Sequence, residues 1–299
     1  MNITKYNKIP TVGVLVVTYN RIKYLKKLIK SLSKINYPMS ELLIFDNNSD
    51  YPIKHLDFIK EYCFEGNPKI TINRSKTNLG GSGGFHYGIK ELYKKYDFVW
   101  TMDDDVSFNP SALSELIQIS KNNVVSVPVK INKNDNIIDV TATNLDLKRY
   151  FFLQHKYGLI KDIIAKSNKI LVETFSFEGV LFPSLIIKNI GLPVNNYFIA
   201  HDDLEYSCRL KKHNFQIILS YNARCKREFE INRTANFFSW KSYYSIRNYF
   251  WVHRDYLNSK LWFTRPAFFS SIFLFFNLIT FNIDSFKNIC KGIIDGIRS

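Results

Sequence analysis

A strand pattern repeated along the N-terminal part of the chain constrains the fold most strongly: an apolar run ends abruptly in polar residues. Residues 12–17 form a valine-rich run that leads into the polar residues 18–21, and residues 41–45 lead into residues 46–49. Between them, residues 24–32 carry apolar side chains at helical spacing. Strand, helix and strand at this spacing predict a βαβ unit, which builds a parallel sheet whose ligands lie beyond the carboxyl ends of the strands.

Further strands are expected at residues 70–73 and 98–102, and each of them also ends in a polar segment. Residues 124–129 and 175–183 continue the apolar pattern, whereas residues 131–170 are rich in Asn and Lys and fit a loop or hairpin region. The sequence therefore predicts an α/β fold with a Rossmann-like mixed sheet, mostly parallel and flanked by helices.

A glycine-rich segment precedes a helical pattern at residues 89–93. It contains Gly80, Gly81, Gly83 and Gly84. Glycines let a ligand approach the backbone closely, and free amides at a helix start can bind phosphate. A flexible turn is the alternative, because the segment matches neither standard phosphate-binding glycine motif.

Three consecutive carboxylates, Asp103, Asp104 and Asp105, follow the apolar run of the fourth expected strand. Adjacent carboxylates repel one another, so their position at a strand end predicts a bound divalent cation. The alternative is an acidic cap on the helix that Pro110 and Glu115 indicate, but that helix begins too late to need all three acids.

A second acidic cluster comprises Asp202, Asp203 and Glu205 and is followed by Arg209 and Lys211. This order of charges matches a helix dipole. The segment is therefore both a predicted helix start and a second candidate site.

The C-terminal third is basic and aromatic. Residues 206–299 hold 15 Lys or Arg against 5 Asp or Glu, which gives +10 of the chain's net charge of +15. Such a segment attracts phosphates in nucleic acid, anionic lipid or nucleotides. Residues 266–281 are almost uncharged and rich in Phe, but shorter than the ~20 residues of a bilayer-spanning helix. They fit a helix in the membrane interface, with a core or oligomer helix as the alternative.

The cysteines lack the spacing of a metal site or a disulfide framework; they are Cys63, Cys208, Cys225 and Cys290. Residues 1–6 turn polar before any long apolar run, so we expect no signal peptide. Both observations favour a reducing, cytoplasmic compartment.

Five segments in this order resemble the family 2 glycosyltransferases of the GT-A fold, and within them the bacterial galactofuranosyltransferases and rhamnosyltransferase-like proteins. They are residues 17–21, 45–49, 78–85, 102–105 and 201–206. The glycine-rich segment together with Asp-Asp-Leu-Glu-Tyr at residues 202–206 favours galactofuranose transfer. The resemblance implies a catalytic domain over residues 1–230, followed by a helical region over residues 231–299 that could associate with a membrane interface.

The resemblance also implies roles for particular residues. Those expected to bind the nucleotide sugar are Thr18, Arg21, Asp46, Asn78, Gly80, Gly81, Asp103 and Asp104. Asp103 and Asp105 would hold Mn²⁺ or Mg²⁺, and Asp203 would be the base that accepts the proton of the acceptor hydroxyl. The residues expected in the acceptor and sugar pocket are Phe177, Glu178, Asp202 and Glu205.

The sequence departs from that family at two places. The His-Glu pair that usually follows the second acidic cluster, and whose His completes the metal site, is matched by Arg227 and Glu228. An aromatic pair of the sugar pocket is matched by Phe177 and Glu178. Either two carboxylates and the diphosphate complete the metal site, or Arg227 partly substitutes as a fixed cation.

The expected function is inverting transfer of galactofuranose from UDP-galactofuranose to a saccharide acceptor, expected to be lipid-linked, in cell-surface polysaccharide synthesis. The enzyme would act in the cytoplasm at the inner face of the cell membrane, on an anionic surface. The alternative donor is dTDP-rhamnose, and the alternatives of another class are a nucleotide-binding protein without turnover and a nucleic-acid-binding protein. No nucleic-acid partner is expected, because the acidic clusters would repel a polyanion. The C-terminal helices could also support an oligomer.

Overall fold

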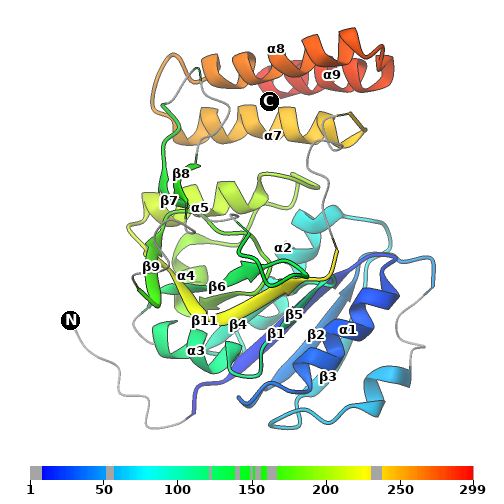
Figure 1. Cartoon of the computed structure of the whole chain (residues 1–299), viewed down its shortest axis with the longest axis vertical. Coiled ribbons are helices and arrows are strands. Elements are labelled where there is room, and N and C mark those ends of the chain that lie inside the picture. The colour runs from blue at the N-terminus through cyan, green and yellow to red at the C-terminus, as the bar shows by residue number, and fades with distance from the viewer. Residues whose placement is uncertain are drawn as a thin grey trace.

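A 9-stranded mixed sheet with helices on both faces forms the centre of the larger part of the computed structural model (Figure 1). The strands lie in the order β3-β2-β1-β4-β10-β6-β11-β5, and β9 pairs with β11. Their bounds are β1 Val12–Thr18, β2 Glu41–Asp46, β3 Lys69–Arg74, β4 Phe98–Asp103, β5 Val106–Phe108, β6 Val125–Ile131, β9 Lys169–Val172, β10 Val180–Pro183 and β11 Ile217–Arg227. The structure describes residues 9–51, 57–120, 123–138, 142–148, 151, 156–159, 167–229 and 238–298.

Strands β3, β2, β1 and β4 are parallel neighbours, and their register brings the polar strand ends together. Thr18 pairs with Asp46 across β1 and β2, and Val17 pairs with Asp103 across β1 and β4. The predicted α/β architecture and the meeting of polar tips at one edge of the sheet are confirmed.

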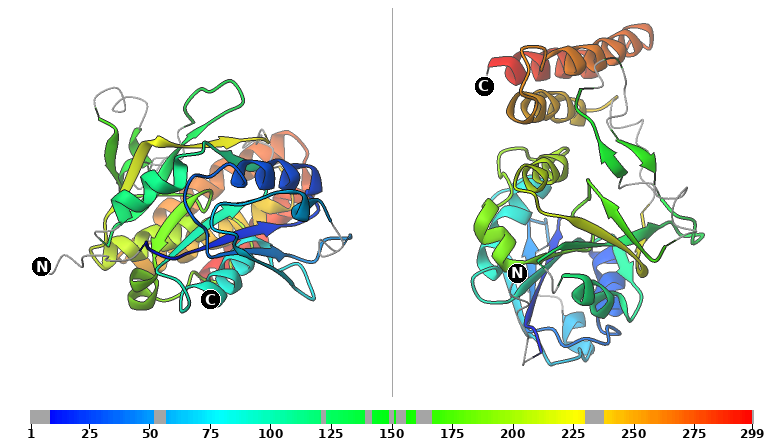
Figure 2. Two further views of the ribbon diagram at one scale, coloured as in Figure 1. Left: turned by 90° about the horizontal axis from the view of Figure 1, so that it is seen from below. Right: turned by 90° about the vertical axis from the view of Figure 1, so that its left-hand side faces the viewer.

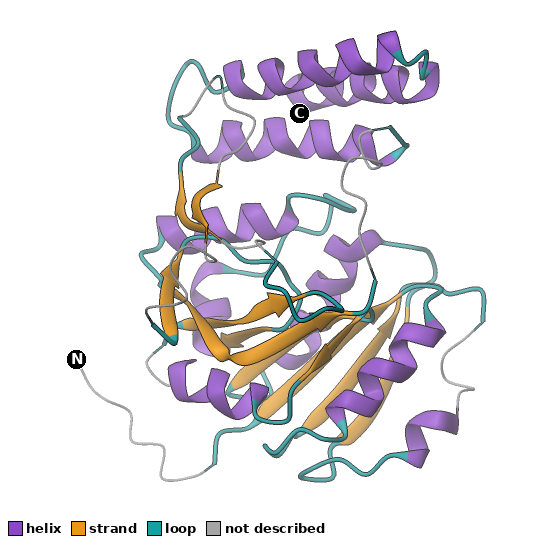
Figure 3. Ribbon diagram, in the orientation of Figure 1, coloured by secondary structure: helices purple, strands orange, loops and turns teal. Residues whose placement is uncertain are grey.

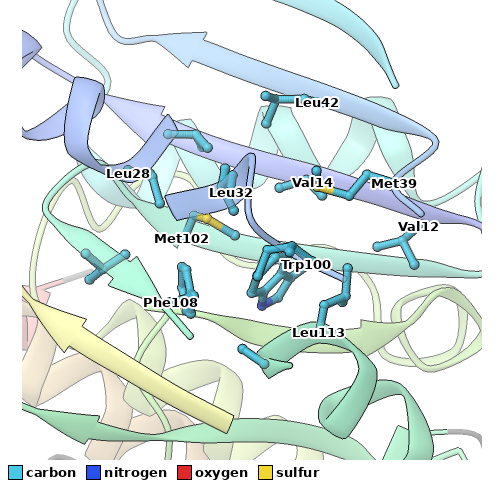
Figure 4. Close-up of a cluster of buried hydrophobic side chains, with 14 of the residues drawn as sticks. Val12, Val14, Leu28, Leu32, Met39, Leu42, Trp100, Met102, Phe108 and Leu113 are labelled. Carbon is cyan, nitrogen blue, oxygen red and sulfur yellow. The ribbon is translucent and has the colours of Figure 1, made fainter. Parts of the chain in front are cut away.

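The sheet is buried on both faces because successive side chains of a strand point to opposite sides. Val14 and Val16 belong to a core cluster beneath α1 (Ile22–Leu32) and α3 (Ala112–Ser120), in which Trp100 is fully buried (Figure 4). Leu15 and Val17 belong to the opposite cluster, with α2 (Gly80–Leu92), α4 (Ser184–Ile190) and α5 (Asp202–Lys212). Burial of side chains of this size contributes about 1.5–3 kcal/mol each. The two core clusters, one on each face of the sheet, hold β1, β2 and β4 in place and so determine the positions of the polar residues at their ends.

The glycine-rich segment is helical, so the alternative of a flexible turn is wrong. α2 begins at Gly80, and its glycines allow the helix to lie close to β1. A Cβ atom on Gly84 would stand 2.5 Å from Val17 Cγ1, and one on Gly88 would stand 2.3 Å from Leu15 Cδ1. Glycine is unfavourable in a helix interior, but here the close contact with the sheet requires it.

The strands differ from the expectation at one place, and one strand was not expected at all. The strand expected over residues 175–183 begins only at Val180, because Gly179 adopts φ +87° and interrupts the extended backbone. The long strand β11 was not predicted, because polar residues and a register shift between Ser220 and Arg224 obscure its pattern. Within the region expected as loop or hairpin, β7 (Ala142–Leu145) and β8 (Lys156–Leu159) form an antiparallel pair.

The helices α7 (Lys241–Tyr256), α8 (Thr264–Ile279) and α9 (Ile283–Arg298) form a separate layer, and α7 lies between the sheet and the α8–α9 pair (Figures 2 and 3). Tyr249 of α7 belongs to a core cluster with Leu204 of α5, and Ile246 belongs to one with Ile289 of α9. The predicted domain boundary at residues 230/231 and the N-terminal residues 1–6 lie outside the described residues. Among the described helices, none has the length and hydropathy needed to cross a bilayer.

Candidate functional site

A cavity of about 500 Å³ opens at the carboxyl ends of β1, β2 and β4. One side is lined by residues that the sequence predicted: Thr18, Arg21, Asn78, Gly80, Gly81, Asp103, Asp104, Asp105 and Glu178. The opposite side is lined by residues 198–200, which precede α5, and by Trp240, Lys241 and Ser245 at the start of α7. A cavity of this size is sufficient for a small-molecule ligand.

Asp104, the middle acid of the triplet, holds the loop that follows β1. Its carboxylate accepts hydrogen bonds from Thr18 Oγ1 at 2.6 Å and from the Tyr19 amide at 3.3 Å. Arg21 donates to Asp105 at 2.7 Å and approaches Asp104 at 3.5 Å. Burial raises the pKa of Asp104 to about 6, although these hydrogen bonds oppose the shift.

Asp103 lines the cavity like its two neighbours, but differs from them because its carboxylate has no hydrogen bond or ion pair with another described residue. Burial raises its pKa well above the usual range, and the carboxylates of Asp105 and Glu178 raise it further. Within the described part of the chain, no group of three or more His, Cys, Asp or Glu side chains is arranged as a metal site. The protein therefore offers a partly uncompensated carboxylate pair, Asp103 and Asp105, instead of a closed metal cage.

Glu178 and Arg227, the two departures from the family pattern, contact each other. The guanidinium of Arg227 donates to the Glu178 carboxylate through Nε at 2.9 Å and through Nη2 at 2.8 Å. Lys130, which is buried, donates to the backbone carbonyl of Glu178. Arg227 is therefore committed to a carboxylate and does not project freely toward a ligand.

Asn47 is a site residue that the sequence indicated only as one of the polar residues 46–49 after a strand. Its side-chain amide donates to Asn78 Oδ1 at 3.0 Å and to the Gly80 carbonyl at 2.8 Å. Its carbonyl oxygen accepts the Leu79 amide at 2.8 Å. Asn47 thus joins the end of β2 to the start of α2, and its place directly after an apolar strand was the signal that could have identified it.

The second acidic cluster lies beside the cavity, not in its lining. α5 begins at Asp202, directly after the loop whose Ala200 lines the cavity. Asp203 Oδ1 accepts the Leu204 amide at 2.7 Å. Burial and the adjacent Asp203 carboxylate raise the pKa of Asp202 to about 7. The predicted helix start is confirmed.

Three of the residues predicted for the site have other surroundings. Asp46 is buried and accepts hydrogen bonds from Arg74 and from the Ser49 amide. Phe177 is buried in the core and stacks on Phe85 with 4.5 Å between ring centroids. Glu205 is buried and bonded to Arg209 and Tyr256. Along with Asp202 and Asp203, none of the three is among the described residues that line the cavity.

A larger cavity of about 1140 Å³ lies at the other end of α7. Its lining includes Lys211 and Lys212 at the end of α5 and Arg254 at the end of α7. Cations at helix C-termini complement the helix dipole, so they need no ligand to explain them. The carboxylates of the first cavity are absent from its lining, and the smaller cavity is the better candidate.

Comparison with known proteins shows similarity to glycosyltransferases. Residues 13–178 match the model of the family described as Glycosyl transferase family 2. The galactofuranosyltransferase GlfT1 of Mycobacterium tuberculosis is 28% identical over 207 residues, which cover 67% of this chain and 64% of that protein. The chain thus spans less than two thirds of the length of this curated relative.

Solved structures share the fold at low sequence identity. GalNAc-T7, solved with UDP, GalNAc and Mn²⁺, superimposes with a TM-score of 0.58 at 13% identity, over 75% of this chain and 44% of that one. Residues 1–349 of Staphylococcus aureus TarS, solved with UDP-GlcNAc, superimpose with a TM-score of 0.54 at 16% identity, over 89% of this chain and 71% of that one.

Proposed function

The chain belongs to glycosyl transferase family 2 and has the GT-A fold, and from this premise we propose that it transfers galactofuranose from UDP-galactofuranose to a saccharide acceptor. The similarity to GlfT1 supports this choice of donor. The observation that carries the proposal is the single cavity lined by Arg21, the start of α2 and the aspartate triplet. A cation-binding carboxylate pair beside a helix start suits a nucleoside diphosphate.

Asp103 and Asp105 fit a hard divalent cation such as Mn²⁺ or Mg²⁺. Both supply carboxylate oxygens, and such cations commonly bind through one or two carboxylates together with substrate phosphates. Burial and the nearby carboxylates of Asp105 and Glu178 raise the pKa of Asp103, and a bound cation would offset this repulsion. When bound, the cation would stabilise the charge on the leaving diphosphate.

Thr18, Arg21 and Asn78 would hold the nucleotide, and Asp104 would keep the loop after β1 in place. Arg21 is bonded to Asp105 and half-exposed toward the cavity, so its remaining N–H groups can reach a phosphate. Gly80 and Gly81 would let the diphosphate approach the backbone at the start of α2.

Asp203 would accept the proton from the acceptor hydroxyl as that oxygen attacks the anomeric carbon from the face opposite the diphosphate. This displacement inverts the configuration and needs no enzyme nucleophile. Asp202, whose pKa is raised to about 7, would act beside Asp203 as its protonated partner near neutral pH. Glu178 would face the transferred sugar from the floor of the cavity.

In the decisive experiment, the purified protein is incubated with a synthetic saccharide-lipid acceptor and either UDP-galactofuranose or dTDP-rhamnose. Each reaction is run with and without Mn²⁺. We expect a glycosylated product from UDP-galactofuranose, and a rate reduced about 10²–10⁴-fold in Asp203→Asn. Product from dTDP-rhamnose alone would identify the alternative donor. Release of UDP without glycosylated product would contradict the proposed transfer. Product formation that Asp203→Asn leaves undiminished would contradict the assignment of the base.

Binding of donor and cation can be tested without the acceptor. UDP with Mn²⁺ should raise the Tm of the wild-type protein, because a ligand that binds only the folded state stabilises it. In Asp103→Asn the increment due to Mn²⁺ should disappear while UDP alone still binds. An equal Mn²⁺ increment in both proteins would exclude Asp103 as a cation ligand.

We also propose that the enzyme works at an anionic membrane surface in the cytoplasm, on a lipid-linked acceptor for cell-surface polysaccharide. Exposed apolar side chains gather where α8 turns into α9: Phe275, Phe276, Leu278, Ile279, Phe281 and Ile283. Lys287 and Lys291 are exposed along α9. Apolar residues flanked by cations suit the interface of an anionic bilayer.

A nucleic-acid platform on α7 has less support. Arg247 lies over the ring of Trp251 at 4.2 Å and donates to backbone carbonyls of the loop before α5. Tyr249 and Phe250 are buried. These three side chains, Arg247, Tyr249 and Phe250, are thus engaged within the protein and are not available to a nucleic acid.

A further inference from the structure

The loop between α4 and α5 has an unusual backbone. Phe198, Ala200 and His201 all adopt φ between 64° and 65°, in the left-handed region. Residues other than glycine adopt this region at a conformational cost, and a run of them persists only where the surroundings fix it. The loop leads directly into Asp202 and Asp203, so whatever fixes it also sets the start of α5.

Asn248 of α7 provides the largest set of contacts to this loop. Its Nδ2 lies 2.9 Å from each of the carbonyl oxygens of Tyr197, Ile199 and Ala200, which share its two N–H donors. Asn248 is fully buried. The buried amide therefore supplies hydrogen-bond donors to the Ile199 and Ala200 carbonyls, and adds to the Ile199 amide and Arg247 at the Tyr197 carbonyl.

Arg247 orients this amide from the neighbouring position. Its Nε donates to Asn248 Oδ1 at 2.9 Å, which directs the Nδ2 group of Asn248 toward the loop. Its Nη2 donates to the carbonyls of Asn196 at 2.9 Å and Tyr197 at 3.2 Å. The planar guanidinium is itself held over the ring of Trp251.

The start of α2 holds the loop from the other side. The Ser82 amide donates to the Phe198 carbonyl at 3.1 Å, and Ser82 Oγ donates to the Val194 carbonyl at 2.7 Å. A Cβ atom on Gly80 would lie 2.0 Å from the same Phe198 carbonyl oxygen. The loop is thus clamped between the nucleotide side of the cavity and α7.

We propose that Asn248, oriented by Arg247, is a positioning residue for the transfer reaction. It holds residues 197–201 in place, with Phe198, Ala200 and His201 in the left-handed region, and so sets the position of Asp203 beside the cavity. The inference rests on the proposed function, because it takes Asp203 as the base. It makes the C-terminal helical layer part of the catalytic machinery.

The test compares Asn248→Asp with the matched control Asn277→Asp. The first change keeps the size of the side chain but turns a carboxylate oxygen toward three carbonyls. Asn277 is equally buried, at 1% exposure, and its amide donates to the Phe273 carbonyl within α8. Arg247→Lys is the second variant, since it retains the charge and loses the two-pronged contact with the loop.

Two readouts are needed, and the first does not depend on turnover. Amide hydrogen exchange across residues 197–204 should become at least about 10-fold faster in Asn248→Asp and Arg247→Lys, and stay near the wild-type rate in the control. The second readout is kinetic: kcat should fall about 10²-fold, because a displacement of about 1 Å at a reacting group has that effect, while the Kd for UDP changes less than about threefold.

Unchanged exchange in the loop of both variants would overturn the proposal, and so would a retained kcat in a protein whose loop exchanges faster. If Asn248→Asp does not fold, Arg247→Lys decides by the same measurements. A wild-type protein that transfers none of the tested sugars would refute the proposed function, whereas hydrogen exchange would still report whether the clamp exists.

Discussion

Arg227 and Glu178 form a two-pronged ion pair beside the cavity that Glu178 lines, with side chains only 12% and 9% exposed. The two residues stand where the family resemblance leads one to expect a histidine and an aromatic residue. Because they contact each other, the two departures are one change: the carboxylate provides the counter-charge that a buried guanidinium needs. The pair also places a second cation near the Asp103–Asp105 cluster, since Arg227 favours the ionised form of Asp105.

Removal of Arg227 should destabilise the protein more than removal of an exposed cation. Arg227→Met leaves the Glu178 carboxylate buried near Asp103 and Asp105, and we expect a loss of about 3–5 kcal/mol in the free energy of unfolding. The control is Lys60→Met, because Lys60 and Asp57 form a pair that is 83% and 84% exposed; its effect should stay within about 0.5 kcal/mol. Urea unfolding measures both, and equal effects would show that the buried pair does not contribute to stability.

Gly80→Ala should disrupt the junction of α2 with the loop before α5. Gly80 adopts φ +70°, and an added Cβ would lie 2.0 Å from the Phe198 carbonyl oxygen. We expect a stability loss above about 2 kcal/mol. The neighbouring Gly81→Ala meets nothing within 4 Å, so its Tm should remain near the wild-type value. A similar Tm decrease in both variants would contradict this prediction, because alanine has the higher helix propensity and Gly81→Ala creates no contact with Phe198.

Stability should fall as the pH rises through neutrality, because buried carboxylates gain charge. The pKa of Asp104 is raised to about 6 and that of Asp202 to about 7, from 3.8 in the unfolded chain. Their folded forms bind protons more tightly, so their contribution is complete below about pH 4 and is lost as the pH passes these values. Asp202→Asn should therefore match the wild type at pH 4 and exceed it by more than about 1 kcal/mol at pH 8.

Urea unfolding across this pH range provides the measurement for Asp202→Asn. The exposed Asp57, whose side chain is 84% exposed, serves as the control, and Asp57→Asn should show no such pH-dependent gain. A gain in Asp202→Asn that grows toward low pH would have the opposite sign and would contradict the burial argument.

Binding to anionic vesicles should depend on the turn between α8 and α9. Phe275 and Phe281 are 60% and 86% exposed there. Phe275→Ser combined with Phe281→Ser should reduce co-sedimentation with phosphatidylglycerol vesicles by at least about 10-fold, because two buried aromatic side chains are lost from the interface. Tyr51→Ser is the control, since Tyr51 is also 86% exposed but lies outside the helical layer. A concentration-dependent dimer that the same double variant abolishes would show that a second copy covers these residues instead.

The sequence was sufficient to predict the βαβ start of the sheet, because residues 12–17 and 41–45 are apolar runs that end in polar residues. It also predicted the start of α5 from the charge order of Asp202 and Arg209. These signals are local: they depend on periodicity and on helix polarity.

The remainder of the site depends on contacts between distant segments. Nothing in the spacing of Arg227 and Glu178 indicates that they pair, since β11 brings Arg227 to the site only through its register with β5 and β6. The sequence placed the glycines of α2 before a helix and left a flexible turn open as the alternative, because their contact with β1, not their own propensity, makes them helical. Asn248 lies in an aromatic, basic helix, and the sequence does not show which of its residues face the loop before α5.

The position of α7 has a practical corollary for anyone who shortens this chain or exchanges its parts. A fragment that stops at residue 230 would keep every aspartate named above and still lose Trp240, Lys241 and the amide of Asn248. We therefore expect the shortest fragment that keeps the complete cavity to extend at least through Tyr256, the last residue of α7. A chimera that takes its last third from a relative would also take that relative's residues in place of Trp240, Lys241 and Ser245 in the lining of the cavity.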